Sequence, residues 1–146
     1  MKKIALALVA IAAFSSCDVK RKDRIADDSN IDSTKRANAM NNPTAVQLID
    51  SAYDFGVVTE GEKVEYSYRF INIGKTPLLV FEATSTCGCT VPEKPQRPIP
   101  PGDTSFIRVV FNSQGKGGKI LKDITVIANT APSFPVLKLT GEVKSK

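Results

Sequence analysis

From Val46 onward, apolar and polar residues alternate along the chain with the period of β-strands. Between Val64 and Ile71, tyrosine, phenylalanine and valine alternate with Glu65, Ser67 and Arg69, the pattern of a strand that buries one face. No part of this region has the spacing of an amphipathic helix. Further segments rich in β-branched and aromatic residues cover residues 78–84, 104–112, 119–128 and 136–143.

Turn-forming sequences separate these segments. They contain glycine, proline and asparagine and lie at residues 60–61, 72–75, 98–102, 114–118 and 131–133. Gly102 ends one of them, in the sequence P-I-P-P-G. With an opening strand near residues 46–53 and a short one near Cys89–Val91, about seven strands are expected. The pattern predicts an all-β fold, an Ig-like antiparallel β-sandwich, with Pro95 and Pro98 near a protected edge.

Residues 1–16 have the features of a secretory signal peptide. Lys2 and Lys3 precede an apolar run from Ile4 to Phe14, and small residues follow. The run is too short to cross a hydrocarbon core of roughly 30 Å comfortably as a helix. We therefore expect an exported protein.

Cys17 follows the small residues at the end of this signal. The arrangement resembles the bacterial lipobox, in which cleavage precedes the cysteine, its thiol receives a diacylglycerol and the new amine is acylated. Phe14 stands where leucine is usual. The alternative is ordinary cleavage after Ser15 with an incidental Cys17. Because each buried methylene contributes roughly 0.8 kcal/mol, several acyl chains, such as palmitate, would hold the protein on a membrane.

Residues 17–45 combine mixed charges with asparagine, serine and aspartate and contain few apolar residues. This composition predicts a flexible, disordered tether, whose ends would lie roughly 30 Å apart. Residues 46–146 would form the folded domain.

Charge does not indicate a nucleic-acid partner. The chain has a formal net charge of +5, but residues 46–146 hold twelve basic and ten acidic residues. The lysines are interspersed with acids and turn residues, so an electrostatic footprint for nucleic acid is not expected.

Catalytic chemistry is also sparse in the sequence. The chain contains no histidine, so Ser-His and Cys-His activation of a nucleophile are excluded, and no serine lies in a G-x-S-x-G elbow. Glycines near Lys116 do not form the G-x-x-x-x-G-K-[ST] phosphate loop. We expect no enzyme activity and no cofactor.

An ordered set of short motifs resembles a known family. The motifs are D-F-G-V-V-T-E-G-E from residue 54, Y-R-F-I-N-I-G-K-T-P-L from 68, C-G-C-T from 87, P-I-P-P-G from 98, F-N-S-Q-G-K-G-G from 111, A-N at 128–129 and L-T-G-E-V from 139. Together they resemble the bacterial domain of unknown function 1573 family. The resemblance implies an exported protein, often a lipoprotein, with an Ig-like sandwich akin to ASPM/SPD-2/Hydin modules. It implies no activity and no catalytic residue.

Cys87 and Cys89 flank Gly88 and admit three interpretations. With Cys17 lipidated, they form an even pair in an oxidising compartment. A disulfide over three residues would contribute only about 1.6 kcal/mol, and in an extended strand the pair would lie at the limit of disulfide geometry, which favours a labile redox couple. Two thiolates could also hold Cu(I), although a closed zinc site needs four ligands.

The third interpretation is a structural corner in which Gly88 supplies an unusual backbone angle above small packed thiols. The shortage of metal ligands and the small stabilisation that a disulfide would give here favour this structural corner. We therefore expect a lipid-anchored, non-enzymatic envelope module, on the periplasmic face or in the outer membrane, that binds a protein or a glycan. The alternative is a redox or Cu(I) protein that uses Cys87 and Cys89.

Overall fold

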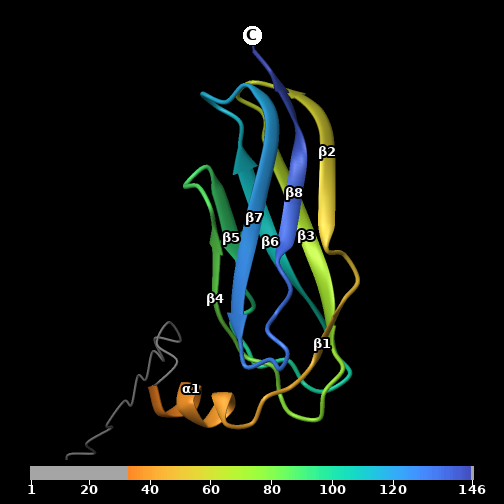
Figure 1. The fold of residues 1–146 in the computed structure, drawn as a ribbon, viewed down its shortest axis with the longest axis vertical. Coiled ribbons are helices and arrows are strands. Elements are labelled where there is room, and N and C mark those ends of the chain that lie inside the picture. Colours follow the sequence, from red (N-terminus) through yellow and green to blue (C-terminus); the bar gives the residue numbers. More distant parts are fainter. Residues whose placement is uncertain (1–32, 146) are drawn as a thin grey trace, which may run out of the picture.

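The structure, a computed structural model, describes residues 33–145 of the chain. One short helix, α1 (Ser33–Met40), precedes the strands (Figure 1). The strands are β1 (Val46–Leu48), β2 (Ala52–Thr59), β3 (Lys63–Asn72), β4 (Val80–Ser85), β5 (Thr90–Glu93), β6 (Thr104–Asn112), β7 (Gly118–Ala128) and β8 (Leu137–Lys144).

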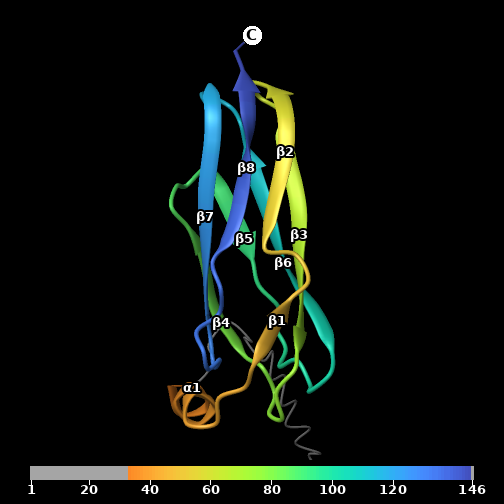
Figure 2. The ribbon, with the colours of Figure 1, turned by 45° about the vertical axis from the view of Figure 1, so that its right-hand side comes forward.

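The strands form two four-stranded sheets that face each other, as the two views show (Figures 1 and 2). One sheet has the order β1-β3-β6-β5 and the other β2-β8-β7-β4. The predicted all-β sandwich is therefore confirmed. Two details differ from the prediction: the described residues form eight strands instead of about seven, and β2 runs parallel to β8 while the other pairs are antiparallel.

The core lies between the sheets and follows the alternation in the sequence. Tyr68, Phe70 and Phe111 are fully buried on one sheet, and Leu137 and Leu139 are buried opposite them. Each such side chain contributes roughly 1.5–3 kcal/mol by leaving water. The apolar core therefore holds the two sheets together without the inter-sheet disulfide and packed tryptophan that are typical of immunoglobulin domains.

The opening strand predicted at residues 46–53 is in fact two strands in different sheets. β1 pairs with β3, whereas β2 pairs with β8. The change occurs at Asp50, whose carboxylate binds the Arg69 guanidinium at 2.7 Å while the backbone N–H groups of Ile49 and Asp50 both donate to the Arg69 carbonyl. This turn redirects the chain, so the prediction of one continuous strand was wrong.

The predicted tether is also too long at its C-terminal end. Ser33–Met40 is helical, although none of its residues is buried; the Arg36 guanidinium lies 4.9 Å from the centre of the Phe81 ring. Thr44 is buried and bridges to Thr130. The attraction between a cation and an aromatic ring can hold a helix against a sheet without an apolar face on the helix. The hydrophobic periodicity of the sequence therefore did not predict this helix. Contacts with the sandwich therefore begin before residue 46.

The predicted signal peptide, Cys17 and the tether up to residue 32 lie outside the described residues. Within residues 33–145, no helix has both the length and the apolar character that a membrane crossing requires.

Candidate functional site

The Cys-Gly-Cys motif lies where the chain passes from one sheet to the other. Residues 86–89 form the turn between β4 and β5, seen at the left of Figure 1. Cys87 and Cys89 form a disulfide, with their Cα atoms 5.4 Å apart. This separation is inside the usual range for disulfides. The segment is a turn and not an extended strand, so the pair does not lie at the limit of disulfide geometry.

Backbone hydrogen bonds hold both ends of this corner. The Thr86 N–H donates to the Asp123 carbonyl of β7 at 3.3 Å, and the Asn112 N–H of β6 donates to the Cys89 carbonyl at 2.9 Å. Within the turn, the Thr90 N–H donates to the Cys87 carbonyl at 3.2 Å. The corner is therefore fixed to each sheet independently of its sulfur atoms.

The two glycines predicted to shape turns behave differently. Gly102 has a φ of +85°, a conformation that favours glycine. Gly88 is exposed in its turn and does not have a positive φ, so the unusual angle expected there is absent. Here the disulfide and the flanking hydrogen bonds, and not glycine's freedom, define the bend.

The structure places the two cysteine sulfurs in a bond with each other, so neither is a thiolate able to bind a metal. Across residues 33–145, no three His, Cys, Asp or Glu side chains are grouped closely enough to hold a metal ion. A Cu(I) site would first require reduction of the pair.

A second feature, which sequence reasoning missed, lies on the outer face of the β3-β6-β5 sheet. Phe106 of β6 is 54% exposed and Val91 of β5 is 56% exposed. Together with Glu65, Glu93 and Arg108 they form what we call the Phe106 surface. The signal was present in the sequence: Phe106 occupies a polar-phase position in a strand whose buried phase is Ile107, Val109 and Phe111.

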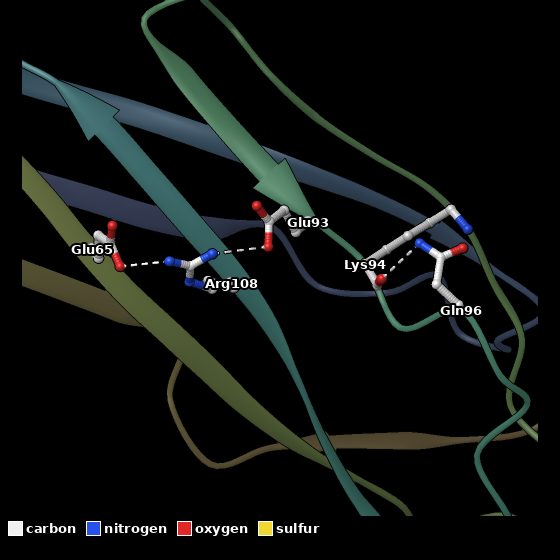
Figure 3. Close-up of polar contacts among 5 residues, drawn as sticks. All are labelled: Glu65, Glu93, Lys94, Gln96 and Arg108. Carbon is white, nitrogen blue, oxygen red and sulfur yellow. Dashed lines mark hydrogen bonds and ion pairs between the residues drawn. The ribbon is translucent and has the colours of Figure 1, made fainter.

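Arg108 is held between two carboxylates on this surface (Figure 3). Its Nη2 donates to Glu65 of β3 at 2.7 Å and its Nη1 donates to Glu93 of β5 at 3.1 Å. The strand register explains the arrangement, because Arg108 lies opposite Ser67 and Glu93, with Glu65 one outward position along β3. The hydrogen bond to Glu65, followed by that to Glu93, raises the pKa of Arg108.

A shallow hollow of about 190 Å³ adjoins this guanidinium. Its lining residues are Glu93, Lys94, Pro95, Ser105, Phe106 and Arg108. Beyond β5, the Gln96 side-chain amide donates to the Lys94 carbonyl at 3.3 Å (Figure 3). The Phe106 surface thus combines an exposed ring, an oriented guanidinium and a concave rim.

The outer face of the other sheet has a larger hollow, of about 450 Å³. Val57 and Leu121 are exposed there, beside Asp54, Lys119 and Glu142. It has no aromatic side chain among its lining residues, so we treat the Phe106 surface as the candidate site.

Comparison with known proteins agrees with this architecture. The family described as "Protein of unknown function (DUF1573)" matches residues 46–143. A comparison with curated proteins finds no match. A protein of unknown function from Porphyromonas gingivalis W83 is similar in structure, with a TM-score of 0.58 and 23% identity; the match covers 68% of this chain and 47% of that one, so this chain spans less than half of its length.

Two further solved structures share the fold at lower identity. The ASH/PapD-like domain 7 of human CEP192 has a TM-score of 0.58 and 12% identity, with 71% of this chain and 88% of that chain covered. The VesB protease of Vibrio cholerae has a TM-score of 0.51 and 14% identity over 76% of this chain and 34% of that chain. At these identities the similarity shows the fold alone.

Proposed function

Since this chain belongs to the DUF1573 family, whose description names no activity, we propose a role from its own geometry: it is a lipid-anchored protein of the bacterial envelope that binds a partner protein and catalyses no reaction. The observation that carries the proposal is the Phe106 surface. Cys17 and the signal before it supply the proposed anchor.

The Phe106 surface has the composition of a binding hot spot. Aromatic and arginine side chains are enriched among residues that dominate binding energy. Phe106 offers a largely exposed ring, and Arg108 is already oriented by two carboxylates. A side chain that is ordered before binding loses less entropy when the complex forms.

A protein fits this surface better than a glycan does. Phe106 and Val91 expose hydrocarbon on the two sides of the charged row of Arg108 and Glu93, because Val91 pairs with Val110 and Phe106 lies two residues from Arg108 in the opposite direction. Exposed aromatic side chains and arginine are enriched at protein interfaces. The proposed partner therefore presents an apolar side chain to the hollow beside Arg108.

The position of the chain ends is compatible with an anchored domain. Figure 1 shows α1 and the C-terminal end of β8 at opposite ends of the sandwich. An anchor before α1 would leave the sheet faces accessible on the sides of the domain. In this proposal, binding occurs laterally to an envelope neighbour.

The anchor is tested by intact mass of the protein extracted from bacterial membranes. We expect a mature chain that begins at Cys17 and carries the mass of a diacylglycerol and an additional acyl chain. Cys17→Ser should abolish both the added mass and membrane retention. A soluble wild-type protein with an unmodified Cys17 would refute the anchor.

The binding surface is tested by affinity capture with the native lipidated protein. Phe106→Ala and Arg108→Glu should each reduce recovery of the partner at least tenfold, because they remove the ring and reverse the charge of the oriented group. Leu121→Ala, at an exposed position of the opposite sheet, serves as the matched control and should retain the partner. Recovery of a glycan instead of a protein, or measurable turnover of a substrate other than by thiol-disulfide exchange, would contradict the proposal.

The closed pair of Cys87 and Cys89 favours a second candidate function, thiol-disulfide exchange. It uses a different part of the molecule from the Phe106 surface.

A further inference from the structure

We infer that the Cys87–Cys89 disulfide is a thiol-exchange site, with Cys87 as the sulfur that an envelope dithiol protein attacks first. The inference goes beyond the proposed function and does not depend on the Phe106 surface. It rests on access to the corner, on a difference between the two cysteines and on the way in which the corner is held.

The outer side of the corner is open. Cys87 and Cys89 are both partly exposed and Gly88 between them is exposed. A Cβ placed on Gly88 would meet no atom within 4 Å. The space beside Gly88 is therefore free of other atoms, and the two flanking cysteines are partly accessible from solvent.

The two sulfur-bearing residues have different surroundings. Cys89 packs against the hydrophobic core. The Cys87 sulfur lies 3.9 Å from the Thr90 hydroxyl, at the start of β5. Packing against the core restricts the approach of a partner thiolate to the Cys89 sulfur, whereas the Cys87 sulfur adjoins a polar group. Cys87 is therefore the better site for the intermolecular bond, and Cys89 is the resolving residue.

The corner can open without loss of the sheets. Its two ends are fixed by the hydrogen bonds from Thr86 to Asp123 and from Asn112 to Cys89, which do not involve sulfur. The disulfide closes a ring across only two positions of sequence separation, so it constrains the unfolded chain little. Reduction should change the corner locally and leave the sandwich folded.

The reaction balances as a two-electron exchange with a partner dithiol. A partner thiolate attacks the Cys87 sulfur; a mixed disulfide forms, the Cys87–Cys89 bond breaks and Cys89 leaves as a thiolate that takes up a proton. The second partner thiol, as its thiolate, then attacks its own sulfur in the mixed disulfide and releases Cys87, which is protonated. The partner dithiol is oxidised to a disulfide and this protein is reduced to two thiols.

The first test uses the full-length protein and dithiothreitol as the probe dithiol. We expect alkylation of two additional thiols, mapped to Cys87 and Cys89, while the far-ultraviolet circular dichroism stays unchanged. Peptide mapping separates any reaction at Cys17. A disulfide that resists reduction until the protein is denatured would overturn the inference.

The second test asks which sulfur is attacked. After brief exposure to reduced glutathione and acid trapping, the mixed disulfide of the wild-type protein should map to Cys87 at least ten times more often than to Cys89. In single variants, Cys89→Ser should react with an aromatic disulfide reagent at least tenfold faster than Cys87→Ser. Equal trapping or a preference for Cys89 would refute the assignment, and the wild-type trapping decides the matter if either variant fails to fold.

Discussion

The ring of Phe55 occupies the space that a side chain on Gly141 would require. A Cβ built on Gly141 overlaps three atoms of that ring, and the ring in turn stacks on Phe111 of the core at a centroid distance of 5.6 Å. Gly141 belongs to β8 and Phe55 to β2, the one parallel pair of strands among those described. The absence of a side chain at residue 141 thus allows β2 to pair with β8 while the Phe55 ring stacks on Phe111.

Gly141→Ala should destabilise the domain by about 1–3 kcal/mol, because the added methyl group forces the Phe55 ring from its place. Urea unfolding monitored by circular dichroism measures the change. Gly88→Ala is the matched control, since a Cβ there meets no atom within 4 Å, and it should alter stability by less than about 0.5 kcal/mol. If Gly141→Ala costs as much in a Phe55→Ala background as in the wild type, the proposed clash is wrong.

Asn129 should be a second sensitive position. It is 2% exposed; its side-chain amide donates to the Pro77 carbonyl at 3.0 Å, and its Oδ1 accepts from the Leu79 N–H at 2.7 Å. Asn129→Ala leaves these backbone groups without partners, so a loss on the order of 2–3 kcal/mol is expected. Asn112→Ala, which removes an exposed hydrogen bond to Gln114, provides the control, and equal losses at the two positions would contradict this role.

Stability should fall in alkaline solution because of Tyr68. Burial, and to a smaller extent the neighbouring Tyr66 and Tyr53, raise the pKa of Tyr68 above its ordinary value of 10.0, and its hydroxyl donates to the Lys138 carbonyl at 2.7 Å. Folding favours the neutral phenol, so its contribution is complete below pH 10 and is lost as the pH rises from there toward the folded-state pKa.

Urea unfolding between pH 8 and pH 11 measures this effect, with ionisation followed by ultraviolet absorbance. Tyr68→Phe should be less stable at neutral pH by about 1 kcal/mol through the lost hydrogen bond, and its stability should fall less steeply above pH 10. A wild-type profile that is flat over this range, or a variant with the same slope, would show that Tyr68 is not responsible.

The strands with strict alternation were predictable because burial of one face requires an apolar residue at every second position. β6 has the predicted bounds, 104–112; β7 begins one residue earlier than predicted, and β8 is displaced by one residue at both ends. β2 was missed beyond Tyr53 because its pairing shifts between Asp54 and Val57, where Gly56 has a φ of +70°. A bulge of this kind breaks the two-residue period.

The candidate site could be predicted only in part. The spacing of Cys87 and Cys89 marks the corner, but their pairing depends on a turn that brings the Cα atoms to 5.4 Å, which periodicity does not reveal. Glu65, Glu93 and Arg108 lie far apart in the sequence and meet only through the register of three strands. α1 was missed because it buries no apolar face, and its contact from Arg36 to the Phe81 ring leaves no periodic pattern in the sequence.

Site-specific photo-crosslinking in intact cells tests the central claim most directly. A photoreactive residue replaces Ser67, which is exposed and lies opposite Arg108, or, as the control, Thr125, which is exposed on β7 of the other sheet. The account predicts a discrete protein adduct from position 67 that Phe106→Ala abolishes, and no such adduct from position 125. An adduct only from position 125, or no protein adduct at position 67, would contradict the proposal that this protein acts by binding a neighbour through the Phe106 surface.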